Sequence, residues 1–105
     1  MIARIWHGKT RTGDAGIYRQ YVIDTGMKDY IRTPGNKGAQ LWQREEGEVT
    51  HIWTISWWTD YDSIKLFAGE DIEKAHYYDE DKQYLLEFEP TVIHCESYHF
   101  PPDQM

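Results

Sequence analysis

The feature that most constrains the fold of this 105-residue chain is the run Val49–Trp58. It is the longest stretch of strand-forming residues, and bulky side chains occupy both of its alternating positions. Successive residues of a strand point to opposite sides of the sheet. One side therefore holds His51, Trp53, Ile55 and Trp57, and the other holds Ile52, Thr54, Ser56 and Trp58. Bulk on both sides predicts a sheet that is buried on both faces.

Three more strands are predicted around this run. Residues 2–8 alternate and end at Gly8, and residues 39–45 form a strand that leads into a hairpin loop at 46–48. The final strand is expected over residues 91–100, after a break at Pro90.

A first helix is predicted between the first two strands. Asp14 is its expected N-cap, and the helix continues in irregular form through residues 27–31. The expected apolar stripe consists of Ile17, Tyr21 and Val22.

A second helical region is predicted after the long strand. Thr59 stands three residues before Asp62, which is a capping-box spacing, so a helix should begin near Asp60. Its buried stripe should consist of Ile64, Phe67 and Ala68, and Gly69 should end it. Further helical turns are expected over residues 71–76 and 82–87.

The resulting order β-α-β-β-α-β is the α+β, ferredoxin-like pattern, with a four-stranded antiparallel sheet and helices on one face. We expect one domain over residues 1–100 and a C-terminal tail over 101–105. The chain carries sixteen aromatic residues, five of them Trp, and each ring brings roughly 150–250 Å² of surface to bury. A homodimer in which a second copy covers the bare sheet face would account for this surplus.

Four segments carry a family resemblance: ISWWTDYD at 55–62, FAG at 67–69, EKAHYY at 73–78 and VIHCE at 92–96. In these four segments the chain resembles the antibiotic-biosynthesis-monooxygenase-like proteins, which are small ferredoxin-like chains that pair into dimeric α+β barrels. The resemblance covers nearly the whole chain. It implies a cofactor-independent monooxygenase, an oxidoreductase acting on a small aromatic, quinol or polyketide-type substrate. The alternative is a non-catalytic small-ligand-binding or haem-binding dimer of the same fold.

Composition excludes several classes of protein. The net charge of −7, with 11 basic residues scattered among 18 acidic ones, argues against nucleic acids and anionic membranes as partners. No apolar run approaches the ~20 residues of a membrane span, and the first residues lack a signal-peptide pattern. The single Cys95 excludes an internal disulfide, favours a cytoplasmic protein and is expected to be a small core residue.

His76 is the first candidate catalytic residue, because an imidazole at a helix end can accept a proton near neutral pH. The structural alternative is a histidine that only interacts with the last carbonyls of that helix. His7 is the second candidate. Haem-degrading relatives combine such a histidine with a Trp on the preceding helix and an Asn on the first strand, where this chain has Phe67 and His7. Haem degradation is therefore not expected, although haem binding through His76 stays open.

Aromatic residues form the candidate substrate-binding group between sheet and helices. Core and dimer packing explains any single ring, but buried tyrosine hydroxyls need polar partners, and this favours a pocket. The group consists of Trp58, Trp53, Phe67, Tyr77 and Tyr78.

No metal site is predicted. His94 and Glu96 share one strand face, but no spacing in the chain matches a known metal motif. His7 and His99 belong to the two terminal strands, which are expected not to be neighbours. The acidic run 79–81 is expected to be solvated surface.

Overall fold

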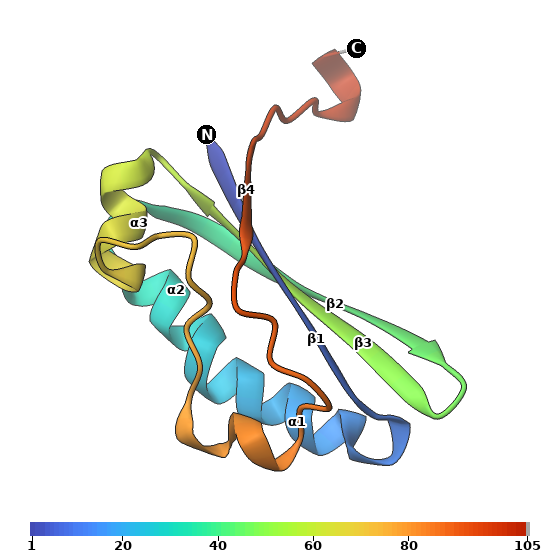
Figure 1. The fold of residues 1–105 in the computed structure, drawn as a ribbon. Helices are drawn as coiled ribbons and strands as arrows, with labels where there is room; N and C mark the ends of the chain where they lie inside the picture. The colour runs from blue at the N-terminus through green and yellow to red at the C-terminus, as the bar shows by residue number, and fades with distance from the viewer. Residues whose placement is uncertain (105) are drawn as a thin grey trace.

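A computed structural model describes residues 1–104 of the chain (Figure 1). Its sheet contains β1 (Ile2–Arg11), β2 (Asn36–Glu46), β3 (Val49–Trp58) and β4 (Ile93–Glu96). The strand order is β2-β3-β1-β4, and every neighbouring pair is antiparallel. The fold is therefore α+β with a four-stranded antiparallel sheet, which is compatible with the ferredoxin-like pattern. The predicted bounds of β3 are confirmed.

The two terminal strands are neighbours, contrary to expectation, because β1 lies at the centre and pairs with both β3 and β4. His7 and His99 still do not meet. Glu96, the last residue of β4, pairs with Ile2 at the start of β1, so the chain leaves the sheet at the end opposite His7.

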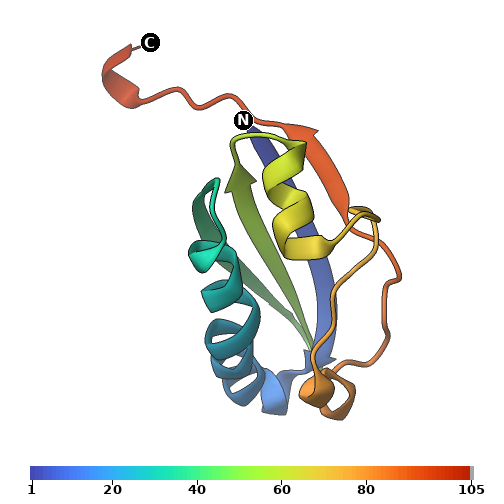
Figure 2. The same cartoon turned by 90° about the vertical axis from the view of Figure 1, so that its left-hand side faces the viewer.

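The helices all cover one face of the sheet (Figures 1 and 2). The first helical region runs through α1 (Ala15–Val22), a π-helical turn η2 (Ile23–Met27) and α2 (Lys28–Arg32). The predicted continuation of this helix is confirmed, but the irregular turn lies at Ile23–Met27, and Lys28–Arg32 form a regular α-helix. After β3 the chain forms α3 (Tyr61–Ala68), which ends at Gly69 with a φ of 83°.

Two details of the first helix differ from the prediction. Asp14 is the N-cap residue of α1, as predicted, but its side chain makes no capping hydrogen bond, and η1 (Thr12–Asp14) leads directly into α1. Ile17 is 62% exposed, whereas the buried residues of α1 are Ala15, Tyr18 and Val22. Residues on one face of a helix recur every three to four positions. The face that meets the sheet contains Tyr18, so its neighbour Ile17 points away from the sheet.

The cap of α3 also differs from the prediction. Asp60, and not Thr59, is the N-cap residue, and its carboxylate accepts a hydrogen bond from the backbone N–H of Ser63 at 2.8 Å. Ile64 is completely buried, and Phe67 and Ala68 pack beside it, so the predicted stripe is confirmed.

Irregular backbone replaces much of the regular structure expected after α3. Residues 71–76 form no helix, and the helical turn η3 spans Asp79–Gln83 and not residues 82–87. β4 is only four residues long, so the strand predicted over residues 91–100 is too long. Pro102–Gln104 form a further helical turn η4, and Met105 lies outside the described residues. We call residues 69–78 the connecting segment.

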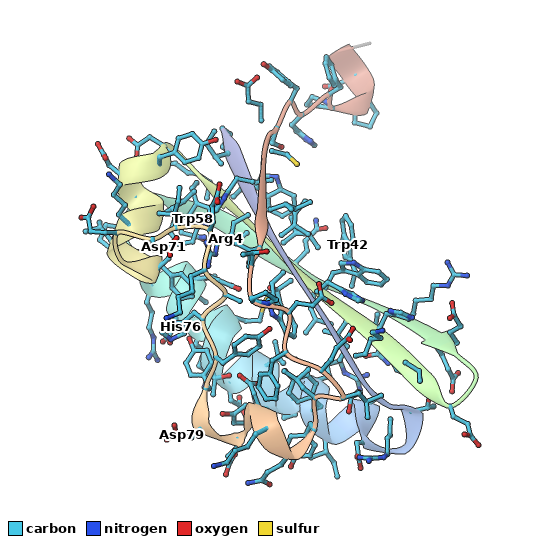
Figure 3. The ribbon with its side chains drawn as sticks, viewed as in Figure 1. Arg4, Trp42, Trp58, Asp71, His76 and Asp79 are labelled. Carbon is cyan, nitrogen blue, oxygen red and sulfur yellow. The ribbon has the colours of Figure 1, made fainter. Side chains whose placement is uncertain are left out.

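The two sheet faces differ in burial. The helix-facing side carries the core, in which Trp58, Ile52 and Ile64 are completely buried. The other side, which we call the open face, carries Trp42 and Ile93, exposed at 50% and 60%. Figure 3 shows Trp42 projecting away from the helices. Cys95 is also exposed, so it is not the core residue that was expected.

Among residues 1–104, no helix is both long and apolar enough to cross a membrane.

Candidate functional site

A small cavity lies between the sheet and the helices. Its volume is about 30 Å³, enough for one or two water molecules. The lining comes from β1, β3, the helical region 15–32, α3, the connecting segment and η3. Its polar or charged members include Arg4, Thr25, Thr54, His76, Tyr78 and Asp81. The cavity also touches the π-helical turn η2, a type of distortion that is frequent at functional sites.

A larger groove lies outside this cavity and shares Phe67 and His76 with it. The groove has a volume of about 500 Å³ and is lined further by Asp29, Arg32, Thr33, Pro34 and Leu66. We call the two spaces the inner cavity and the outer groove. Because they share two side chains, a ligand in the outer groove would contact the entrance of the inner cavity.

His76 stands at this entrance and is the exposed member of the inner lining. Its ring lies 5.4 Å from the ring of Phe67 and 4.9 Å from that of Tyr78, measured between centroids. Among the described residues, no side chain or backbone group forms a hydrogen bond with its imidazole. Both ring nitrogens are therefore available to a ligand or to water.

Arg4 is the buried cation of the inner lining, and the sequence analysis did not single it out. Its side chain extends from β1 towards the helices and is 2% exposed. Nη1 donates to the carbonyl of Ile72, and Nη2 donates to the carbonyl of Lys74 at 3.1 Å. Its Cζ atom lies 5.6 Å from the centre of the Phe67 ring, a cation–π distance.

The tyrosine hydroxyls of the lining are satisfied inside the chain. Tyr18 donates to Asp81 at 2.8 Å, Tyr78 donates to Asp29, and the Tyr30 hydroxyl lies 3.0 Å from that of Thr54. Tyr77 donates to the carbonyl of Glu89 at 2.5 Å. The surplus hydroxyls thus do not require a ligand, which removes the sequence argument that they favour a pocket.

Burial keeps these phenols protonated. Loss of hydration raises the pKa of Tyr18, Tyr30, Tyr77 and Tyr78, and neighbouring carboxylates raise it further for Tyr18 and Tyr78. Near neutral pH they are hydrogen-bond donors and cannot serve as bases.

Asp81 corrects the expectation that the run 79–81 is solvated, because it is only 5% exposed. Its two oxygens accept hydrogen bonds from the Tyr18 hydroxyl and from the backbone N–H of Tyr78, the latter at 2.6 Å. Burial raises the pKa of this carboxyl, an effect that these hydrogen bonds oppose. Asp79, by contrast, is exposed and is labelled in Figure 3.

The structure brings together only part of the predicted binding group. Phe67, Tyr77 and Tyr78 line the inner cavity. Trp58 is completely buried behind Phe67, with ring centroids 6.1 Å apart, and does not line it. Trp53 lies on the open face, where it pairs with Trp42 and His7, so its assignment to this group is wrong.

His7 also lies on the open face and cannot share a site with His76, because the sheet separates them. Its Nδ1 is hydrogen-bonded to Glu89, and its Nε2 lies 2.9 Å from Nδ1 of His51. The ring of Trp53 lies 5.1 Å from that of His7, in a tilted arrangement, and is stacked at 5.6 Å on that of His51. His7 therefore belongs to a separate, internally paired cluster.

The inner cavity is too small for haem. The inner cavity of about 30 Å³ is far below the ~300–1,000 Å³ of ordinary cofactor pockets, and the rings of Phe67 and Tyr78 flank His76. Within the described part of the chain, no group of three or more His, Cys, Asp or Glu residues could hold a metal ion.

Arg4 left a weak signal in the sequence. Alternation along β1 puts it on the same side as Ile2 and Trp6, so a charge falls within an apolar face. Asp81 left no such signal, because its burial depends on contacts with α1 that are distant in sequence.

No protein-family model and no curated protein matches this chain.

Proposed function

We propose that the chain is a cofactor-independent, monooxygenase-like protein that acts on a small electron-rich aromatic such as a quinol or polyketide-type phenol. The substrate ring lies in the outer groove, and its reacting hydroxyl reaches His76. The observation that carries this proposal is the position of His76, which joins the groove to the inner cavity and has no internal hydrogen bond. The proposal also rests on the resemblance of residues 55–96 to the monooxygenase-like family.

His76 acts as the proton acceptor in this scheme. It removes the hydroxyl proton of the substrate, and the resulting anion supplies electrons to molecular oxygen. For a phenol, one ring C–H bond and the O–H bond are broken and both carbons become C=O, with one oxygen atom of O2 entering the product and the other leaving as water with the two hydrogens. The substrate provides all four electrons, so no cofactor is needed. The chain contributes orientation, a base and partial exclusion of water.

A second copy of the chain covers the open face in this proposal. Exposed Trp42 and Ile93 flank the partly buried Trp53 and Trp57 there, and such an apolar face on a small domain marks an interaction surface. The α3 side stays accessible in such a dimer, because the helices lie on the opposite face of the sheet (Figure 2). The exposed single thiol of Cys95 fits the cytoplasm as its location.

Oxygen uptake with a panel of hydroquinones and polyphenols tests the activity. We expect uptake by the wild-type protein and a loss of about 100-fold or more in His76→Gln, because general bases typically contribute about 10²–10⁴-fold. His99→Gln, at an exposed position in the C-terminal segment, is the matched control and should retain activity. Absence of uptake by the wild-type protein with the whole panel would remove the enzymatic function for this class.

A non-catalytic ligand-binding protein is the second candidate function. The structural observation in its favour is that the phenols of the lining are all engaged internally, which leaves few groups for catalysis. Binding of the same aromatics without oxygen uptake would establish this function.

A further inference from the structure

We infer that the inner cavity accepts the anionic oxygen of the ligand and that Arg4 is its counter-ion. This inference rests on the proposed ligand site and adds the chemical class of the ligand: a small aromatic that carries a carboxylate or phenolate. The carrying observation is that Nε of Arg4 is fully buried and has no hydrogen-bond partner.

The other contacts of Arg4 are all with uncharged acceptors. These are the carbonyls of Ile72 and Lys74, the imidazole Nε2 of His94, which lies 3.1 Å from Nη1, and the nearby hydroxyl of Tyr30. Among the ion pairs of residues 1–104, none includes Arg4. Asp71 is labelled beside Arg4 in Figure 3, but it is exposed, and no ion pair joins the two among the described residues.

A purely structural role explains part of this arrangement. Through the two carbonyls, Arg4 fixes the connecting segment against the sheet. That role uses Nη1 and Nη2 but leaves both the positive charge and the Nε–H without a partner. Buried charges are normally paired, and buried donors are normally hydrogen-bonded. An anionic oxygen in the inner cavity would satisfy both requirements.

The geometry also limits the ligand. Of the five N–H groups of Arg4, Nη1 uses two and Nη2 uses one, so the Nε–H and the second Nη2–H remain for a ligand oxygen. A cavity of about 30 Å³ accepts an oxygen but no ring. The ring must therefore stay in the outer groove, against Phe67 and Leu66.

A pair of probes of nearly equal shape tests the charge requirement on the wild-type protein. Benzoate and benzamide are titrated by calorimetry, and the Nε–H resonance of Arg4 is followed by NMR. We expect benzoate to bind at least about 10-fold tighter and to shift the Arg4 Nε–H signal, because hydrogen bonds to charged groups are the stronger ones. Equal affinity of the two probes, or benzoate binding that leaves this signal unmoved, overturns the inference. So does the absence of binding by every anionic probe.

Titration of 4-nitrophenol separates the two sources of the anionic oxygen. Its phenolate absorbs visible light, so a decrease of the phenol pKa on binding is observed directly. Comparing the affinities of benzoate and 4-nitrophenolate then shows whether the preferred ligand carries a carboxylate or a phenolate. Both outcomes support an anionic ligand. Oxygen uptake with neutral hydroquinones tests the proposed function separately. If only the inference about Arg4 is wrong, oxygen uptake is still observed, and charged and neutral aromatics bind equally well.

Two variants assign the effect to Arg4. Arg4→Gln should lose about 10-fold or more in benzoate affinity while its benzamide affinity stays within about twofold. The control is Lys82→Gln, which removes an exposed cation that lines neither the inner cavity nor the outer groove and should change benzoate binding little. Arg32 of the outer groove is the competing cation, and a larger loss in Arg32→Gln than in Arg4→Gln overturns the inference. If Arg4→Gln does not fold, the wild-type NMR titration still decides the matter.

Discussion

Nη1 of Arg4 lies 3.1 Å from Nε2 of His94, and the two residues are paired across β1 and β4. A guanidinium only donates hydrogen bonds, so His94 must accept through Nε2 and carry its proton on Nδ1. His94 is therefore neutral in the folded chain. Burial lowers its pKa, and the charge of Arg4 lowers it further.

This pair predicts a loss of stability in mild acid. The folded-state pKa of His94 lies below its ordinary value of 6.5, so the unfolded chain binds more protons between these two values. The contribution is fully present above pH 6.5 and is lost as the pH falls through the folded-state pKa. We expect the free energy of unfolding of His94→Gln, measured by urea denaturation, to depend less on pH below 6.5 than that of the wild type. His99→Gln, at an exposed position, is the control, and an equal reduction there would contradict the assignment.

The raised pKa of Asp81 predicts a loss of stability as the pH rises, which is the opposite of the trend expected from His94. Its folded-state pKa is raised above the ordinary 3.8, so its contribution is fully present below pH 3.8 and is lost as the pH rises through the folded-state pKa. Asp81→Asn removes this loss, since an amide can still accept from the Tyr78 N–H and donate to the Tyr18 oxygen. We expect the stability of Asp81→Asn relative to wild type to increase between pH 3.5 and about 7.

The exposed Asp79→Asn variant controls for the change in net charge on the same helical turn. A relative stability of Asp81→Asn that falls with rising pH would contradict the burial of an ionisable Asp81.

Gly8 predicts a packing defect. A methyl group at this position would lie 2.7 Å from Cζ2 of Trp6 and 2.9 Å from Cδ2 of Leu85, both in the core. Gly8→Ala should therefore lower the free energy of unfolding by about 1–3 kcal/mol, as overpacked cores do. Gly16→Ala, on the exposed side of α1 with no atom within 4 Å, is the control, and it should be neutral or stabilising by up to about 1 kcal/mol. Equal effects in thermal melts would exclude the packing explanation.

The open face predicts a change in assembly. Ile93→Lys places a charge on this face, whereas Ile17→Lys places the same charge on α1, and the two isoleucines are similarly exposed at 60% and 62%. We expect Ile93→Lys to convert the proposed dimer to monomers in light-scattering chromatography, because an unpaired charge is costly to bury. Ile17→Lys should stay dimeric. A wild-type protein that is monomeric at micromolar concentration would end the dimer proposal.

The positions of the regular helices and strands along the chain could be predicted from local sequence patterns. Which side of each helix faces the sheet could be predicted only in part. The alternation of β3 predicts its bounds, and the Gly69 ending and buried stripe of α3 are also confirmed. The stripe on α1 was misplaced because Ile17 and Tyr18 are both apolar neighbours, and only packing against β1 and η3 selects Tyr18. The connecting segment could not be predicted, since its conformation is held by contacts of Ile72 and Lys74 with Arg4 on the distant β1.

The sequence by itself determined a sheet of alternating strands, two helical regions and an excess of aromatic surface. These properties follow from the preferences and spacing of residues that are neighbours along the chain. Only the tertiary structure decided that Arg4 and Asp81 are buried, that His76 faces a groove, and that the sheet separates it from His7. The physical reason is that the burial of a charge, and the face on which a side chain meets its partners, depend on segments that come together only when the chain folds.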